Sequence, residues 1–369
     1  SFPAQALKLC SAAMGSLFSA FNPQEIEKPQ DIYEEVLQKL PSLAGKSIAI
    51  TGCTTGLGYY LALAAARKGA AKVLLLNRPS DRATKAEKDV AEKSSGQVMT
   101  VPCDLMDFNS VRQAAAKVQS VVGQGLDVLA LNAGVMALND TRTSEGFEIQ
   151  MHTNQLSHVL LLSKLMPQLE ACAKQKGDAR VVFHSSSARD FPSCDLDAAY
   201  FKKSEPGTLG GDHQWMMSEV AGLCGGPWHR YHMTKLANAA YAMKLHEVLA
   251  ARGSKVKSMA VDPGASVTEL QRTSVVQGNM SNCLANLAMS GSNSQSAADG
   301  STPLITACFD PGAESGDFYM PEGGMTGPPM KSISKGVAVV SGKEARTTNP
   351  ANKDLAWKES HAALGIESV

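Results

Sequence analysis

The sequence predicts an α/β fold, a doubly wound parallel sheet of Rossmann type with helices on both faces. The first observation is a series of strand-length apolar runs between residues 47 and 264: SIAIT, VLLLN, QVMTVPCD, DVLALNAG, ARVVFHSSS and VKSMAVDPG. The second is that helix-length segments separate these runs, at 57–68, 80–93, 109–122, 147–175 and 231–251. Strands that are apolar throughout are buried on both faces, and their alternation with helices is typical of a parallel sheet.

Length and composition fit this fold and exclude some functions. The chain has 369 residues, of which 44% are apolar, and this suits one large α/β domain with extensions, or two domains. Lysine plus arginine and aspartate plus glutamate number 35 each, so no overall positive charge attracts nucleic acid. The aromatic content of 5% provides few side chains for base stacking. We therefore expect no nucleic-acid partner.

The eight cysteines are irregularly spaced and form neither a CxxC pair nor a Cys/His cluster of zinc spacing, so we expect no metal site. Several lie inside apolar segments, which predicts buried free thiols in a reducing intracellular compartment. The chain starts at Ser1 rather than Met, which is consistent with a processed targeting peptide and with an organelle, either plastid or mitochondrion. No apolar run approaches the ~18–20 residues that a membrane span needs.

Residues 1–43 are predicted to form a helical extension. Apolar side chains recur at helical spacing over residues 1–21, where Lys8 is the only charge. This segment could lie on a membrane surface or bind a partner protein as an amphipathic helix, or it could pack on its own domain, and the pattern leaves these alternatives open. A second short helix, over 32–40, is expected to stop at Pro41.

A Gly-rich turn follows the first strand, where TGCTTGLG lies between SIAIT and a helix rich in Ala and Leu. Glycines here permit a tight turn, close approach of the backbone to a pyrophosphate, and close helix–strand packing. By itself the motif is also compatible with a purely structural turn. The residues predicted to bind a dinucleotide at this turn are Thr51, Gly52, Thr55, Gly56, Leu57 and Gly58.

The ends of the next strands predict which dinucleotide binds. A carboxylate after the second strand would bond the ribose 2′-hydroxyl of NAD, but this chain has Asn77 and Arg78 there. A guanidinium suits a 2′-phosphate, so NADP(H) is favoured over NAD(H), although Arg78 also fits an ordinary exposed loop position. Small or acidic residues at later strand ends are predicted to lie beside the cofactor, and these are Asp104, Leu105, Asn132, Ala133 and Gly134.

Tyr231 and Lys235 are spaced i,i+4 on one face of a helical segment. A free phenol has a pKa near ~10, and a nearby ammonium together with a positively charged nicotinamide would lower it. Ser186, in the run SSS at a strand end, could then hold the substrate oxygen. A Tyr/Lys pair alone also fits a surface position, but its occurrence with the other motifs favours a general acid–base group.

Taken in order along the chain, these motifs resemble the short-chain dehydrogenase/reductase family from about Gly45 to Tyr319. The matching runs are TGCTTGLG, CDL, NAG, TNQLSH, HSSS, YHMTK and DPG, and the longer runs TNQLSHVLLL and YHMTKLANAAYAMKL are most similar to the retinol-dehydrogenase-like and protochlorophyllide-reductase-like branch. The resemblance implies about seven parallel strands in a domain over 44–320, followed by a C-terminal tail at 321–369. It implies a catalytic tetrad in which Asn154 supports the lysine through a water relay, with Ser185 as second choice for the serine: Asn154, Ser186, Tyr231 and Lys235. Further cofactor contacts are implied for Pro263, Gly264 and Thr268.

A long insert over 188–230 separates Ser186 from Tyr231 and is expected to lie near the substrate, because both its ends adjoin catalytic residues. Its apolar side chains could roof a pocket for an extended apolar molecule, or could pack the insert onto the sheet or onto a partner; they are Phe191, Trp215, Met216, Met217 and Trp228. The resemblance implies hydride transfer to or from a carbonyl, an alcohol or an activated double bond of a lipophilic retinoid, carotenoid or tetrapyrrole. The alternative, of a different class, is a cofactor-binding but catalytically idle subunit of a larger complex, including a membrane-bound one. An oligomer fits either alternative.

Overall fold

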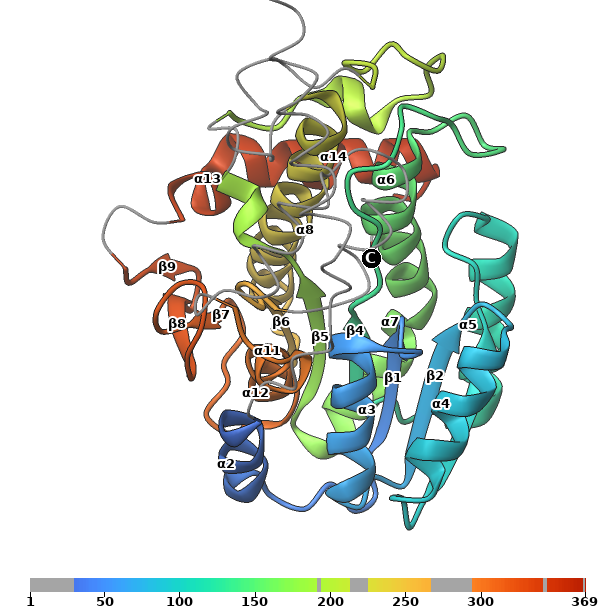
Figure 1. Ribbon diagram of the computed structural model, residues 1–369, viewed down its shortest axis with the longest axis vertical. Helices are drawn as coiled ribbons and strands as arrows, with labels where there is room; N and C mark the ends of the chain where they lie inside the picture. Colours follow the sequence, from blue (N-terminus) through green and yellow to red (C-terminus); the bar gives the residue numbers. More distant parts are fainter. Residues whose placement is uncertain (1–29, 191–193, 213–224, 267–293, 341–343, 368) are drawn as a thin grey trace, which may run out of the picture.

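The computed structural model describes residues 30–190, 194–212, 225–266, 294–340, 344–367 and 369 (Figure 1). Its centre is a nine-stranded sheet in the order β3-β2-β1-β4-β5-β6-β7-β8-β9. The first seven strands pair in parallel, and β8 and β9 are antiparallel. The strands are β1 Ser47–Thr51, β2 Lys72–Asn77, β3 Gln97–Pro102, β4 Val128–Leu131, β5 Ala179–His184, β6 Val256–Val261, β7 Phe318–Pro321, β8 Pro329–Ser334 and β9 Val337–Ala338.

The α/β fold is confirmed with seven parallel strands, and two short antiparallel strands bring the sheet to nine rather than the expected total of about seven. The difference comes from β8 and β9, which the sequence places in a polar, Gly/Pro-rich segment. Short antiparallel strands at the edge of a sheet do not need the continuous apolar pattern of buried parallel strands. Strand signals based on apolar runs therefore miss them.

Helices cover both faces of the sheet, and alternate side chains of each strand supply the two cores. On β1, Ala49 belongs to the core beneath α5, α7 and α8, whereas Ile48 and Ile50 belong to the core beneath α2, α3 and α12. This alternation follows from the two-residue period of a strand. The helices are α2 Asp31–Lys39, α3 Gly56–Arg67, α4 Asp81–Ala91, α5 Phe108–Val122, α6 Ile149–Met151, α7 Ser157–Lys176, α8 Gly226–Ala251, α11 Ala297–Gly300, α12 Thr302–Phe309, α13 Ala345–Thr348 and α14 Pro350–Leu364.

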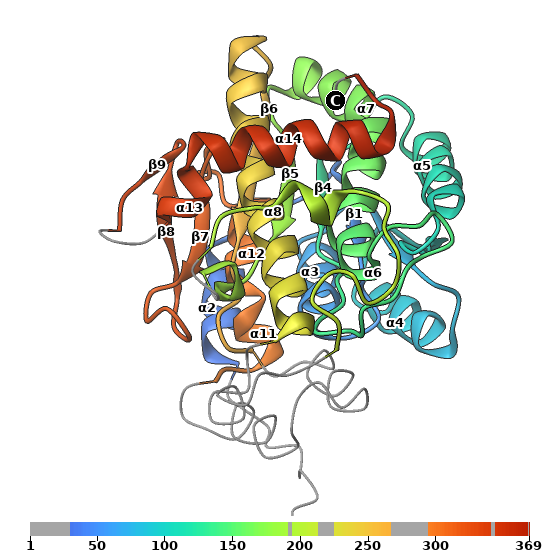
Figure 2. The same cartoon turned by 90° about the horizontal axis from the view of Figure 1, so that it is seen from above.

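The C-terminal residues pack against the domain rather than extending from it. Helix α14 runs across α8, as Figure 2 shows. Trp357 stacks on Tyr241 of α8 with 5.1 Å between ring centroids, and the Tyr241 hydroxyl lies 2.9 Å from Nε2 of His361. The segment predicted as a tail therefore contains β8, β9, α13 and α14, and the domain boundaries themselves stay a prediction.

The N-terminal extension is described only from residue 30. Its short helix, α2, runs from Asp31 to Lys39, close to the predicted 32–40, and buries Tyr33 and Leu37 in the core beneath α3 and α12. The expectation of a membrane or partner contact through residues 1–21 lies outside the described residues. Within the part of the chain that the structure describes, no helix combines the length and the apolar character needed to cross a bilayer.

Candidate active site

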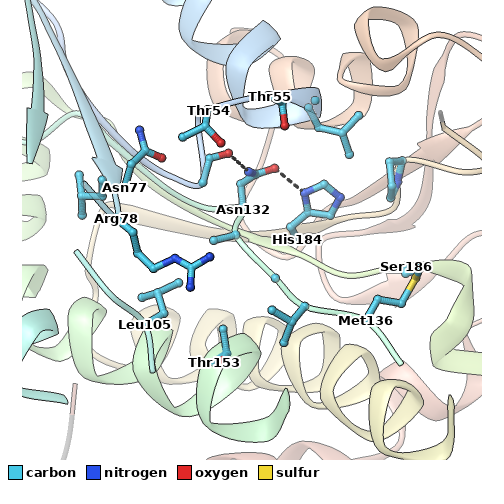
Figure 3. Close-up of a pocket in the computed structure, with 18 of the residues that line it drawn as sticks. Thr54, Thr55, Asn77, Arg78, Leu105, Asn132, Met136, Thr153, His184 and Ser186 are labelled. Carbon is cyan, nitrogen blue, oxygen red and sulfur yellow. Dashed lines mark hydrogen bonds between the residues drawn. The ribbon is translucent and has the colours of Figure 1, made fainter. Parts of the chain in front are cut away.

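A cleft of about 340 Å³ lies at the carboxyl ends of the parallel strands, where β1 and β4 are neighbours and the strand order reverses direction (Figure 3). Ligands of open α/β sheets bind at such a switch point. Thr51, Gly58 and Asn154 are not among the residues that line the cleft, and Thr268 lies outside the described residues. The predicted site residues that line it are Gly52, Thr55, Gly56, Leu57, Arg78, Asp104, Leu105, Asn132, Ala133, Gly134, Ser186, Tyr231, Lys235, Pro263 and Gly264.

The Gly-rich turn forms one wall of the cleft and leaves no room for side chains at two of its glycines. A Cβ atom on Gly52, whose φ is +73°, would lie 2.9 Å from Ala133 Cα. A Cβ atom on Gly58 would lie 2.3 Å from the carbonyl oxygen of Gly52. Helix α3 then begins at Gly56 without a side-chain hydrogen bond from Thr55 at its start. Its first backbone N–H groups are therefore available to an anion.

Thr51 and Asn132 hold this turn in place. The Thr51 hydroxyl accepts the backbone N–H groups of Asn132 and Ala133, each at 3.0 Å. The Asn132 amide donates to the carbonyls of Thr51 and Gly52 at 2.9 and 3.0 Å, and its oxygen accepts a hydrogen bond from Nδ1 of His184 at 2.9 Å. The side chain of Asn132 is thus bonded within the protein and shapes the turn; Asn132 lines the cleft, and its place on the adenosine side stays a prediction.

Donor groups gather at the end of β2. The oxygen of Asn77 accepts the Cys53 N–H at 2.7 Å, while its Nδ2 is buried without a hydrogen-bond partner. The side chain of Arg78 extends into the cleft beside it (Figure 3), and Arg82 also lines this end. A buried amide donor without a partner is costly, so this position favours a ligand that brings an acceptor.

Ser186, Tyr231 and Lys235 converge at the other end of the cleft. Tyr231 and Lys235 lie on α8, with the ammonium 5.6 Å from the centre of the phenol ring, and Ser186 follows β5. The Ser186 hydroxyl accepts the Ala188 N–H at 3.2 Å and also hydrogen-bonds to the Tyr231 phenol. Lys235 Nζ donates to the His184 carbonyl at 2.9 Å. An alcohol, a phenol and an amine thus share one buried corner.

Burial dominates the protonation of this group. It raises the pKa of Tyr231 well above its usual value, an effect that the hydrogen bond from Ser186 opposes. Burial also lowers the pKa of Lys235 to about 8, against the opposing influence of Asp262. The Lys235 ammonium donates to the His184 carbonyl, and the prediction that it lowers the phenol pKa together with a positively charged nicotinamide stays a prediction.

Asn154 lies behind the catalytic group, in a π-helical turn over His152–Leu156 that leads into α7. Its side-chain oxygen accepts the Val135 N–H at 2.8 Å, and its Nδ2 donates to the Val135 carbonyl at 2.8 Å and to the Thr234 hydroxyl at 3.0 Å. A Cβ atom on Gly134 would lie 3.3 Å from this side chain. Asn154 therefore ties the loop after β4 to α8, and its water relay to Lys235 stays a prediction.

The insert is anchored by buried charges next to Tyr231. Arg230 is fully buried, and its guanidinium lies 3.4 Å from Glu148 and 3.6 Å from Asp140. Trp228 packs edge-on against Tyr231, with ring centroids 6.0 Å apart, so this tryptophan follows the packing alternative. The other apolar residues proposed as a roof lie outside the described residues; they are Phe191, Trp215, Met216 and Met217.

Several residues that line the cleft were missed from the sequence, and His184 and Thr153 are two polar ones among them. His184 is a buried histidine at the end of β5, and Thr153 precedes Asn154 with a hydroxyl that has no partner in the structure (Figure 3). Each is the first residue of a motif that was recognised, HSSS or TNQLSH. A polar residue at the end of an apolar strand was the available signal for His184. No sequence pattern distinguishes Thr153 from its polar neighbours.

Comparison with known proteins identifies the family. A model described as short chain dehydrogenase matches residues 46–200. A short-chain dehydrogenase/reductase of Aspergillus calidoustus is 32% identical, over 63% of this chain and 71% of that protein. The chain belongs to the short-chain dehydrogenase/reductase family. Two further relatives of this oxidoreductase family are a polyprenol dehydrogenase of Mus musculus, 32% identical over 63% of each chain, and retinol dehydrogenase 13 of Homo sapiens, 30% identical over 64% of each.

Solved structures agree with the fold of this short-chain dehydrogenase/reductase. An uncharacterized protein from Mycobacterium paratuberculosis is 26% identical, with a TM-score of 0.65 over 90% of this chain and 98% of that one. L-sorbose reductase from Gluconobacter frateurii, in complex with NADPH and L-sorbose, has a TM-score of 0.57 at 20% identity, over 77% of this chain and 97% of that one. The chain spans 57–64% of the length of the first curated relatives that it matches. Members of the family bind NAD(P)(H).

Proposed function

We propose that this protein is an NADP(H)-dependent oxidoreductase that interconverts a carbonyl and an alcohol of a lipophilic substrate. The observation that carries the proposal is the convergence of Ser186, Tyr231 and Lys235 at one end of a cleft that begins at a Gly-rich turn. Donors for an anion lie at one end of this cleft and proton-transfer groups at the other. This arrangement suits a dinucleotide whose reactive ring reaches the buried corner.

The residues of the cleft fit NADP(H). The glycines that admit no Cβ leave the backbone of the turn exposed to a pyrophosphate, which the start of α3 would bind. At the end of β2, the unpartnered Nδ2 of Asn77 and the guanidinium of Arg78 are both donors, and this strand end carries no carboxylate. Donors suit the 2′-phosphate of NADP(H), whereas a carboxylate would suit the 2′-hydroxyl of NAD(H).

The catalytic residues supply hydrogen bonds and a proton. Bound NADPH would supply the hydride to the carbonyl carbon of the substrate. Ser186 donates a hydrogen bond to the carbonyl oxygen, where negative charge develops, and Tyr231 transfers its phenolic proton to that oxygen. Protonated Lys235, 5.6 Å from the phenol ring, stabilises the phenolate that remains until solvent protons restore it. In alcohol oxidation the same groups act in reverse.

A lipophilic substrate is favoured by the side chains near the catalytic group and by the relatives. Met136 and Val135 line the cleft after β4, and Met136 lies near Ser186 (Figure 3). Two of the relatives are a polyprenol dehydrogenase and a retinol dehydrogenase. We therefore place isoprenoid and retinoid aldehydes or alcohols first, ahead of carotenoids and tetrapyrroles and ahead of reduction of an activated double bond.

The test is turnover by the purified chain with NADPH or NADH and a panel of retinoid, isoprenoid and short polar aldehydes. We expect oxidation of NADPH in preference to NADH, with the lipophilic aldehydes as better substrates than the polar ones. Tyr231→Phe is the matched control, because it keeps the ring and its packing but removes the proton. Binding of NADPH without turnover of any substrate would instead favour the catalytically idle subunit.

A further inference from the structure

Next to the catalytic serine lies a buried arginine that the proposed mechanism does not use. Arg189 is three residues after Ser186, in a short 3₁₀ turn, and only 2% of it is exposed. A buried guanidinium is costly to desolvate unless charges and acceptors surround it. Its partners come from three segments that are far apart in the sequence.

On the side of the cleft, Arg189 joins the two loops that flank the catalytic corner. One nitrogen, Nη1, donates to the backbone carbonyl of Ser186 at 2.9 Å and to Oδ2 of Asp262 at 2.7 Å. The other oxygen of Asp262 accepts the Gly264 N–H at 2.9 Å and so holds the turn after β6 that lines the cleft. Arg189 therefore sets the position of the Ser186 backbone relative to this turn.

On the far side, the C-terminal segment clamps the same guanidinium. Both oxygens of Glu344 accept hydrogen bonds from Arg189, one of them at 3.1 Å. The hydroxyls of Ser332 and Thr347 each donate to Glu344 at 2.9 Å, and the guanidinium lies 4.4 Å from the centre of the Phe318 ring. These contacts fix the plane of the Arg189 guanidinium on the side away from the cleft, which a single ion pair would not do.

The same ion network sets the charge that surrounds Tyr231 and Lys235. The carboxylate of Asp262 acts to raise the pKa of Tyr231 and that of Lys235. Arg189 forms an ion pair with this carboxylate through Nη1, and its Nη2 forms a second ion pair with Glu344. On the outer side Asp190 lies 3.6 Å from Arg346. The other groups that face Tyr231 are Lys235, whose ammonium lies 5.6 Å from the ring centre, and the uncharged Ser186 and Trp228.

We propose that Arg189 is a positioning residue for the reaction proposed above: it holds the Ser186 backbone against the Asp262–Gly264 turn and neutralises the carboxylate that faces Tyr231 and Lys235. The inference rests on the proposed function, and it makes the C-terminal segment part of the catalytic architecture. Arg189 contributes to this reaction in two ways, through the planar geometry of its guanidinium and through its positive charge.

The test compares Arg189→Lys with Arg189→Met in the full chain. Lysine keeps the charge but lacks the planar fork. We expect both variants to lose kcat by roughly ten- to a hundred-fold, because Ser186 is misplaced, with little change in the KM for NADPH. Only Arg189→Met should raise the pH at which NADP⁺-dependent alcohol oxidation reaches half of its plateau, by roughly one unit, because the Asp262 carboxylate then opposes ionisation of the phenol.

Removal of a carboxylate instead of the arginine should shift the pH midpoint in the opposite direction. Asp262→Asn removes the carboxylate, so the same midpoint should move to lower pH. Glu344→Gln weakens the clamp on the guanidinium, so it should lower kcat, although by less than the Arg189 variants, and it tests the positioning role if both Arg189 variants fail to fold. Wild-type kcat in both Arg189 variants would overturn the positioning role. Equal pH midpoints in Arg189→Met, Asp262→Asn and the wild type would overturn the charge role.

A second readout does not depend on turnover. NMR titration of the Lys235 side chain, assigned with Lys235→Arg, should give a midpoint near the pKa of about 8 in the wild type. Asp262→Asn should lower this midpoint and Arg189→Met should raise it. If the wild type turns over no substrate, the proposed function fails, and the direction of these two shifts still decides the charge role of Arg189.

Discussion

The two ends of the cleft are built by different means. At the dinucleotide end, hydrogen bonds between neighbouring strand ends hold the turn, as in the bonds of Asn132 to Thr51 and Gly52. At the catalytic end, a buried ion network joins segments that lie 155 positions apart, from Arg189 to Glu344. The dinucleotide end depends on glycines, which carry no side chain, and the catalytic end depends on a balance of buried charges.

This difference predicts how substitutions at each end impair the protein. A substitution at the dinucleotide end should act through steric conflict and weaken cofactor binding, with little dependence on pH. A substitution at the catalytic end should leave cofactor binding intact and change kcat or its pH profile. The predictions below test this division, from the largest expected effect to the smallest.

Tyr231→Phe should have the largest effect on catalysis. Removal of the proton donor should lower kcat by roughly 10²- to 10⁴-fold, because the phenol is the general acid of the proposed reaction. The dissociation constant of NADPH, measured by fluorescence titration, should stay within about two-fold of the wild type, since the ring and its packing on Trp228 remain. Unchanged turnover at saturating cofactor would remove Tyr231 from the mechanism.

Gly58→Ala should break the dinucleotide end. Its Cβ would lie 2.3 Å from the Gly52 carbonyl oxygen and 2.4 Å from the Asn132 amide, so the turn must shift. We expect a loss of roughly 1–3 kcal/mol of folding stability from overpacking and a marked loss of NADPH affinity. Gly125→Ala is the control, because its Cβ would meet only the Val122 carbonyl at 3.9 Å. Equal NADPH affinity in the two variants would contradict the steric account of the turn.

Arg78→Ala should change the choice of cofactor. Loss of a charged hydrogen bond to the 2′-phosphate should weaken NADPH binding by roughly ten-fold, while NADH binding is unchanged. The comparison is made by titrating each cofactor into the wild type, Arg78→Ala and the control Arg112→Ala, an exposed arginine of α5 outside the cleft. A parallel loss for NADH and NADPH would place Arg78 elsewhere than at the 2′-phosphate.

His361→Gln should give the smallest effect, on acid stability. Burial lowers the pKa of His361 to about 4, below the value of 6.5 that applies in an unfolded chain. Unfolding therefore takes up a proton between these values, so the stability from neutral His361 is present above pH 6.5 and declines as the pH falls toward 4. Tm measured from pH 7 to pH 4.5 should fall less steeply in the variant, and identical slopes would contradict this assignment.

The sequence predicted the local features of both ends of the cleft but not the ion network at the catalytic end. Glycines, strand ends and the Tyr231/Lys235 spacing are local signals, and each depends on residues a few positions apart. Arg189 and Glu344 carry no local pattern, because only the fold shows that one neutralises the other. The same holds for β8, whose short half-buried strand lacks an apolar run, and for the protonation of Tyr231, which burial controls.

The central claim is that Ser186, Tyr231 and Lys235 act on a carbonyl beside the nicotinamide. Transfer of deuterium from NADPH labelled at C4 to a retinoid or isoprenoid aldehyde tests it most directly. We predict deuterium on the carbinol carbon of the alcohol formed by the wild type, and almost none with Tyr231→Phe at the same NADPH occupancy. An unlabelled product, or equal transfer by both proteins, would contradict the claim.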